Sequence, residues 1–127
     1  MKKLFSIAIQ MDPLEKINPK EDSTYLIAKE AQNRGFKTFH YLPKDITFKN
    51  NQIIAKGFYF KILNNTKKFF KKQKKISINL NNFNCVLVRQ DPPFNMEYIT
   101  ATYLLDMLHK DVLVINNPTE IRNNPEK

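Results

Sequence analysis

Short apolar blocks separated by polar stretches predict that strands and helices alternate along the chain. Residues 4–10 are apolar and partly β-branched, over a length typical of one buried strand. Further on, four small or apolar residues recur at the spacing i, i+3, i+4, i+7, which predicts one buried face of a helix: Thr24, Ile27, Ala28 and Ala31.

Residues that favour helix ends lie on both sides of this stretch. Asp22 and Ser23 are suitable N-terminal caps, and Gly35 is placed to end the helix. Residues 36–41 then alternate as a second strand. A strand, a helix and a strand in this order predict a right-handed unit with parallel strands.

The middle of the chain predicts a hairpin followed by a less regular stretch. Residues 46–48 and 53–55 flank Asn50-Asn51, a pair typical of a tight turn between antiparallel strands. Residues 57–82 are expected to form an edge strand and then a lysine-rich helix or loop.

The last third repeats the alternation of strand and helix. Residues 85–88 are wholly apolar, which is typical of a central parallel strand, and residues 112–115 predict a fourth one. Between them, helical spacing relates Tyr98, Ala101, Thr102, Leu105 and Leu108. The pattern predicts a three-layer α/β domain with about four parallel strands and an inserted β-hairpin.

Composition narrows the class of protein. The chain has 127 residues, enough for one domain, with two glycines and one cysteine. Two distant glycines exclude a P-loop and a glycine-rich dinucleotide loop, and one cysteine excludes an internal disulfide. No apolar run is long enough to cross a membrane, and we interpret residues 4–10 as a strand rather than an export signal. We therefore expect a cytoplasmic protein.

The net charge of +9 is concentrated in one region. Residues 44–82 hold ten lysines and a single acid, Asp45, whereas the rest of the chain is neutral. The cluster at residues 67–75, with Phe69 and Phe70, could contact phosphates and stack on bases. A solvated face with both phenylalanines turned inward is the interpretation that we favour, because charge alone is weak support for nucleic-acid binding.

Polar residues followed by proline come directly after three of the predicted parallel strands. These segments are Met11-Asp12-Pro13, residues 89–94 and Asn116-Asn117-Pro118. Parallel strands end at the same edge of a sheet, where α/β proteins bind ligands. Proline stiffens such loops, so the sequence predicts a site for a small polar anion at this edge.

Arg89 is the strongest candidate in this site because it directly follows an apolar strand and its guanidinium suits a carboxylate. The alternative, with about equal weight, is an arginine that pairs with Asp91 or Asp12 and locks the loops. Asp12 could accept from a substrate amine or cap a turn, Ser23 could face an anion at a helix N-terminus or only cap it, and Asn116 could bond a ligand or a loop.

The remaining reactive side chains are expected to be structural. His40 and His109 have no acidic partner nearby in sequence, and we predict no metal site. Cys85 begins an apolar run and is interpreted as a small buried hydrophobic residue. No arrangement of nucleophile and base emerges, so no catalytic residue is assigned in this chain.

These motifs together resemble the N-terminal domain of bacterial glutathione synthetase. The stretches that carry the resemblance keep their order from end to end: Met11-Asp12-Pro13, Ile17-Asn18, Lys20 with Asp22-Ser23, Glu30-Ala31-Gln32 with Arg34-Gly35, Arg89 with Asp91-Pro92-Pro93-Phe94, Ala101-Thr102-Tyr103, Asn116 with Pro118, and Arg122 with Asn124 and Glu126-Lys127. Residues 44–82 match poorly.

The resemblance implies a pre-ATP-grasp (Rossmann-like) fold over residues 1–127 and a ligase that joins γ-glutamylcysteine to glycine. ATP and Mg²⁺ would be held by a C-terminal ATP-grasp domain that is absent from this chain. We expect neither ATP nor Mg²⁺ to bind to residues 1–127. Arg89 would then hold a carboxylate of γ-glutamylcysteine, with Asp12, Ser23, Asp91 and Asn116 around it. The isolated chain would be inactive and would form homo-oligomers.

Two other functions stay open at this stage. The chain could be a non-catalytic assembly or regulatory module from a truncated or split homologue. Less in keeping with the sequence, it could bind nucleic acid through its lysine-rich segment.

Overall fold

The computed structural model describes residues 5–18, 23–63, 68–89, 96–108 and 110–115. Within them, seven strands form one mixed sheet: β1 (Ser6–Gln10), β2 (Lys37–Lys49), β3 (Gln52–Ile62), β4 (Phe70–Lys72), β5 (Ile76–Asn79), β6 (Cys85–Val88) and β7 (Leu113–Ile115). The same residues also form two α-helices and two short 3₁₀ turns: α1 (Ser23–Asn33), α2 (Met96–Leu105), η1 (Leu14–Lys16) and η2 (Leu80–Asn82).

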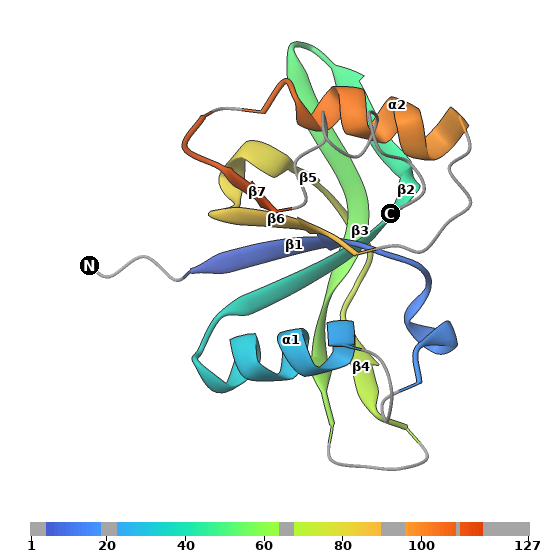
Figure 1. Ribbon diagram of the computed structural model, residues 1–127, viewed down its shortest axis with the longest axis vertical. Coiled ribbons are helices and arrows are strands. Elements are labelled where there is room, and N and C mark those ends of the chain that lie inside the picture. Colours follow the sequence, from blue (N-terminus) through green and yellow to red (C-terminus); the bar gives the residue numbers. More distant parts are fainter. Residues whose placement is uncertain (1–4, 19–22, 64–67, 90–95, 109, 116–127) are drawn as a thin grey trace.

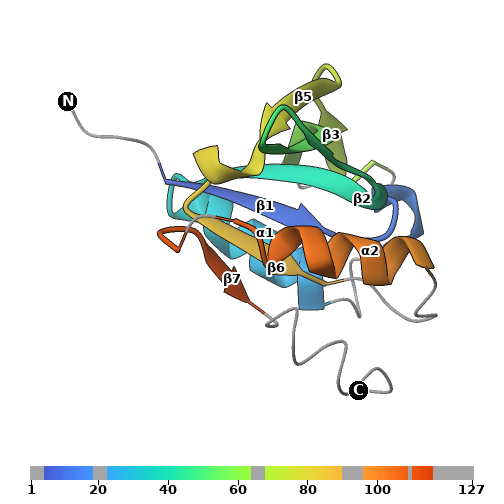
Figure 2. The same cartoon turned by 90° about the horizontal axis from the view of Figure 1, so that it is seen from above.

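The four predicted parallel strands are confirmed, in the order β2-β1-β6-β7. Helix α1 covers one face of this sheet and α2 the other, which gives the predicted three layers (Figure 1). The same arrangement is seen from above in Figure 2. Among the described residues, no helix is long and apolar enough to cross a membrane.

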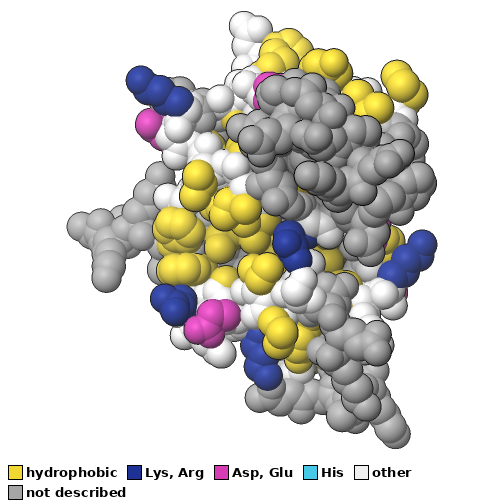
Figure 3. Space-filling model, in the orientation of Figure 1, with side chains coloured by type: hydrophobic (Ala, Val, Ile, Leu, Met, Phe, Trp, Pro, Cys, Tyr) yellow, Lys and Arg dark blue, Asp and Glu magenta, His cyan; other side chains and the backbone are white. Residues whose placement is uncertain are grey.

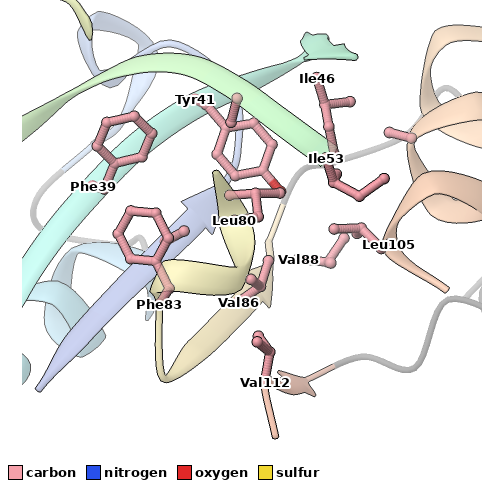
Figure 4. Packing of buried hydrophobic residues seen from close by; sticks show 13 residues of the cluster. Phe39, Tyr41, Ile46, Ile53, Leu80, Phe83, Val86, Val88, Leu105 and Val112 are labelled. Atoms are coloured by element: carbon pink, nitrogen blue, oxygen red, sulfur yellow. The ribbon is translucent and has the colours of Figure 1, made fainter. Parts of the chain in front are cut away.

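Strict alternation along the central strands divides the core into two clusters. On the α2 side, Ala8 of β1 and Val86 and Val88 of β6 pack with the helix residues Ala101 and Leu105. Figure 4 shows this cluster, in which side chains from the hairpin and from η2 also meet. On the α1 side, the intervening residues of the same strands pack against Ala28 and Ala31. A strand that is buried on both faces must be apolar at every position, as 85–88 are.

The predicted helices form, with ends close to those expected. Thr24, Ala28 and Ala31 are buried on α1, and Gly35 follows its end with a left-handed φ of +84°. On α2 the buried residues include Ala101, Thr102 and Leu105, and Leu108 packs against the core just past the helix. The cap Asp22 and the side chain of Tyr98 lie outside the part that the structure describes.

The hairpin is confirmed and is longer than expected. Asn50 and Asn51 both have a positive φ, of 52° and 60°, which is the geometry of a tight turn that favours asparagine. Separate strands are expected at residues 36–41 and 46–48, whereas the structure has the single strand β2 from Lys37 to Lys49, whose register shifts between Tyr41 and Ile46.

The lysine-rich stretch is where the sequence-based interpretation is partly wrong. The described residues between 68 and 79 form no helix, and β4 and β5 both pair antiparallel with β3. The two strands lie end to end along β3, with β5 opposite Ile54–Gly57 and β4 opposite Phe60–Ile62. As expected, Phe69 and Phe70 turn inward, against the α1-side cluster.

One glycine determines how closely the hairpin strands approach. Gly57 of β3 is paired with Tyr41, and a Cβ atom at this position would lie 1.9 Å from the carbonyl oxygen of His40. Since the obstructing atom belongs to the backbone of β2, no side-chain movement could relieve the contact.

An apolar surface is exposed at the other end of the sheet. Leu113 and Ile115 of β7 are 61% and 44% exposed, and hydrophobic side chains gather in the region of β6 and β7 on the face shown in Figure 3. Within the described residues, β7 pairs only with β6 and therefore forms an edge of the sheet.

Candidate functional site

The candidate site lies where β1 and β6 end side by side. The parallel ladder continues one residue beyond each strand: the Met11 amide donates to the Tyr41 carbonyl at 3.3 Å, and the Arg89 amide donates to the Gln10 carbonyl at 2.8 Å. These bonds fix the backbone from which Asp12 and Arg89 leave the sheet. The expectation that the first and third predicted strands end at a common edge is confirmed.

The guanidinium of Arg89 is held against the first turn of α1. Its Nη2 donates to the Ser23 hydroxyl at 2.5 Å, and its Nε donates to the Thr24 hydroxyl at 3.4 Å. Thr24 is buried, so one anchor is fixed by the core, whereas Ser23 is exposed. Within the described residues, the structure records no ion pair of Arg89 with a carboxylate.

The surroundings of Arg89 are electropositive. The first turn of a helix carries a partial positive charge from amides that have no partner inside the helix. A guanidinium beside that turn adds a full positive charge, and the two hydroxyls that hold it are neutral. Both sources favour an anion, and a planar carboxylate can accept two bonds from a guanidinium.

A neutral, buried hydrogen bond lies beneath this edge. Tyr41 donates its hydroxyl to the Gln10 side-chain oxygen at 3.1 Å, and both residues are almost fully buried. Burial raises the pKa of Tyr41, so the phenol stays protonated and acts as a donor. Gln10 therefore joins the core to the site, because its own carbonyl accepts from the Arg89 amide.

The loop after β1 is the second wall of the site. We call residues Met11–Lys16 the Asp12 elbow; it turns at Pro13 into η1, where the amides of Lys16 and Ile17 bond back to Pro13 and Leu14. Leu14 is buried and anchors the turn. The carbonyl oxygen of Asp12 lies 3.0 Å from Nε2 of His40.

The outer end of the elbow meets the lysine-rich strand. Glu15 forms an ion pair with Lys72 of β4, and the bond from Lys72 lowers the pKa of Glu15. Both side chains are substantially exposed, so the pair contributes little to stability.

The structure places three of the five predicted site residues. Arg89 and Ser23 are brought together by a direct hydrogen bond across 66 positions of sequence, and Asp12 follows the neighbouring strand at the same edge. Asp91 and Asn116 lie outside the described residues.

Four residues that support the site were not predicted from the sequence. Thr24 was recognised only as part of the buried helix face, and Gln10 only as the end of a strand. Tyr41 and His40 alternate correctly on β2, but nothing local indicates that they contact the Asp12 elbow or its base. A polar residue closing an apolar strand, as Gln10 does, is the one signal that could have drawn attention.

The expectation that Cys85 is a small buried residue is confirmed. Cys85 is buried, and burial raises the pKa of its thiol to about 11, which keeps it protonated. In the part of the chain that the structure describes, no three His, Cys, Asp or Glu side chains gather as a metal ion would require.

Comparison with known proteins agrees with the fold and with the motifs at this edge. The family model described as "Prokaryotic glutathione synthetase, N-terminal domain" matches residues 5–122. The chain belongs to this family. The Rossmann-like pre-ATP-grasp fold suggested by the motifs is confirmed by this membership together with the mixed α/β sheet.

Three individual relatives are similar to this chain along almost its whole length. A glutathione synthetase of Agrobacterium fabrum is 39% identical over 127 residues, which is all of this chain and 40% of that protein. One from Rhodopseudomonas palustris is 37% identical over 121 residues, or 95% of this chain and 39% of the relative. One from Buchnera aphidicola of Acyrthosiphon pisum is 39% identical over 123 residues. The chain thus spans about two fifths of the length of the curated relatives that it matches.

Proposed function

We propose that this chain supplies the γ-glutamylcysteine-binding side of an ATP-dependent ligase that adds glycine to form glutathione. The observation that carries the proposal is the guanidinium of Arg89, which is held at the N-terminal turn of α1 by Ser23 and Thr24. Two electropositive groups at the carboxyl edge of a parallel sheet are suited to the carboxylate of a small peptide. The chain's membership of the glutathione synthetase family supports this choice of peptide.

The chemistry assigns binding and orientation to these residues, and no bond-making step. In the reaction, ATP phosphorylates the cysteinyl carboxylate and leaves as ADP; the glycine amine then attacks the acyl phosphate, expels phosphate and forms the peptide bond. Arg89 would neutralise a carboxylate of γ-glutamylcysteine and fix its direction. Such positioning accelerates a reaction by holding the reacting group near its partner.

The other predicted residues would line the same binding site. Asp12 would accept from the substrate ammonium, and Ser23 would donate its hydroxyl proton to the bound carboxylate while its oxygen accepts from Arg89. Asp91 and Asn116 follow β6 and β7 in sequence and are proposed to line the site as well.

ATP and Mg²⁺ are proposed to bind elsewhere in the full-length enzyme. The described residues offer no cluster of carboxylates for a metal, and the whole chain has only two glycines, too few for a phosphate-binding loop of that kind. We therefore assign the nucleotide, the metal and the reacting centre to a C-terminal ATP-grasp domain. The isolated chain would be inactive, and the enzyme would work in the cytoplasm.

A chimera tests this proposal. Residues 1–127 would replace the matching N-terminal part of the Agrobacterium fabrum relative, and glutathione formation would be measured with ATP, glycine and γ-glutamylcysteine. We expect activity from the chimera and none from residues 1–127 alone. A folded chimera that binds ATP but makes no glutathione would contradict the proposal, with the intact relative as the positive control.

A second candidate function is self-assembly, which the exposed apolar residues of β7 favour. Leu113 and Ile115 project from an edge strand, and such edges readily pair with another chain. We expect the isolated chain to form dimers in sedimentation experiments, and Leu113→Lys to shift it to monomers. A monomeric wild-type chain at high concentration would remove this candidate.

A further inference from the structure

His40 lies near the start of β2, with its imidazole buried on the α1 side of the sheet. The residue is only 3% exposed. Its ring stacks on Phe58 of β3, with centroids 4.8 Å apart and an interplanar angle of 18°, and meets the edge of Phe60. From this position Nε2 reaches the Asp12 carbonyl oxygen at 3.0 Å, across 28 positions of sequence.

The chemistry of the partner decides which ring nitrogen carries the proton. A carbonyl oxygen only accepts hydrogen bonds, so Nε2 must be the donor. In the neutral ring, Nδ1 then holds the lone pair, and within the described residues this buried atom has no hydrogen-bond partner. A buried polar atom without a partner is unfavourable, and an apolar ring at position 40 would avoid it. Compared with an apolar ring, the imidazole at position 40 provides one additional interaction, the hydrogen bond to the Asp12 carbonyl.

The surroundings keep the ring neutral. Burial is the main cause that lowers the pKa of His40. Two charged groups face it from other elements: Glu15 of η1, which favours the protonated ring, and Lys72 of β4, which opposes it. Because these two side chains pair with each other, their effects on the ring partly cancel.

We propose that His40 is a positioning residue, whose Nε2–H holds the Asp12 carbonyl and so sets the direction in which the Asp12 elbow leaves β1. His40 thus holds the elbow at Asp12, whereas the contact at its other end is the exposed ion pair of Glu15 with Lys72. The position of the Asp12 elbow relative to Arg89 is therefore determined by its hydrogen bond to His40 on β2, and not by contacts within the loop alone. This inference rests on the proposed function of the Arg89 edge.

Two variants that differ by one methylene group test the proposal. The amide nitrogen of Gln can reach about as far as Nε2, whereas that of Asn is too short to reach the Asp12 carbonyl. In the 127-residue chain we expect His40→Asn to speed amide exchange at Lys16 and Ile17 about fivefold to tenfold, as the loss of one buried hydrogen bond implies. His40→Gln should restore exchange to near the wild-type rate. The control is Thr38→Val on the same strand as His40, which removes the bond that Thr38 donates to the Phe60 carbonyl and the bond that it accepts from Gln32, neither of which involves the elbow.

Kinetics in the chimera link the elbow to the substrate. We expect His40→Asn to raise the KM for γ-glutamylcysteine more than Thr38→Val does, with a kcat close to that of the parent. If the chimera makes no glutathione, the proposed function fails, but amide exchange in the chain still decides the role of His40. Exchange at Lys16 and Ile17 that is unchanged in His40→Asn would overturn the proposal.

A measurement on the unmodified chain covers the case in which His40→Asn does not fold. The ¹⁵N shifts of the imidazole distinguish the two tautomers. We expect a protonated Nε2 and an unprotonated Nδ1 at neutral pH. The opposite tautomer cannot donate to Asp12 and would overturn the proposal.

Discussion

The two halves of the sheet differ in how their positively charged side chains are held. The parallel half, β2-β1-β6-β7, ends in one arginine whose guanidinium is held by two hydroxyls. The antiparallel half carries the lysines of β3, β4 and their connections, and the side chains of Lys56, Lys61 and Lys71 are exposed to solvent. One cation that the fold holds in place is a better candidate for ligand recognition than many solvated ones, because solvent screens exposed charges.

The two halves also differ in what joins them to the core. β1 and β6 are buried on both faces. Because these strands are held rigidly in the core, the residues just beyond their ends are held in place as well. β4 is a three-residue edge strand with two exposed lysines. The predictions below test this contrast, beginning at the junction of the halves, where β3 pairs with β2.

Gly57→Ala should have the largest effect. The added Cβ would meet the His40 carbonyl oxygen at 1.9 Å, and β2 and β3 would have to separate. We expect a loss of about 3 kcal/mol in the free energy of unfolding, or failure to fold, as measured in urea.

Gly35→Ala is the matched control for this substitution. There is open space around Gly35, so only its positive φ opposes a side chain. We expect a loss of about 1 kcal/mol. Equal losses at the two positions would contradict the close approach of β3 to β2.

Acidification should destabilise the domain through His40. The pKa of this ring is lowered in the folded chain, whereas in the unfolded chain it is near 6.5. The unfolded state therefore binds more protons below pH 6.5, and stability falls as the pH decreases through that value, by at most about 1.4 kcal/mol per pH unit. Above pH 6.5 this contribution is constant.

Comparison of variants isolates this effect from other titrating groups. Unfolding of the wild type, His40→Gln and Thr38→Val would be followed between pH 5.5 and pH 7.5. We expect His40→Gln to be less sensitive to pH than the wild type, and Thr38→Val to keep the wild-type slope. The same slope in all three chains would show that His40 does not titrate differently on folding.

The smallest effects are expected in the antiparallel half, and their signs should differ between adjacent lysines. Lys71 lies directly opposite Lys61, so Lys71→Glu should stabilise the chain by less than about 1 kcal/mol. Lys72→Glu should destabilise it slightly, because Lys72 pairs with Glu15. Both effects should shrink in high salt; effects of the same sign would contradict the observed register of β4.

Much of the fold could be predicted because its signals are local. The apolar run 85–88, the repeat on α1 and the Asn50-Asn51 turn each describe a structure formed within a few residues. The strands β4 and β5 could not be found in this way. The partners of β5 on β3 are distant in sequence, and in β4 the lysines obscure the alternation of apolar and polar positions.

The same distinction applies to the site. Arg89 could be predicted from its place after an apolar strand, and its contact with Ser23 agrees with the expectation of a shared edge. Thr24 and His40 could not be assigned a role, because their bonds cross 65 and 28 positions of sequence. Local patterns predict which residues reach the edge, whereas their partners depend on how the layers pack.

The most direct test of the central assignment is the affinity of the Arg89 variant for the peptide substrate. In the chimera described above, Arg89→Gln should raise the KM for γ-glutamylcysteine about 10-fold to 100-fold, as the loss of hydrogen bonds to a charged group implies, and leave the KM for ATP unchanged. Arg34→Gln, which removes an exposed arginine paired with Glu30, is the control and should change neither constant. A KM for γ-glutamylcysteine that stays within about twofold of the parent in Arg89→Gln would contradict the role of Arg89 in holding a substrate carboxylate.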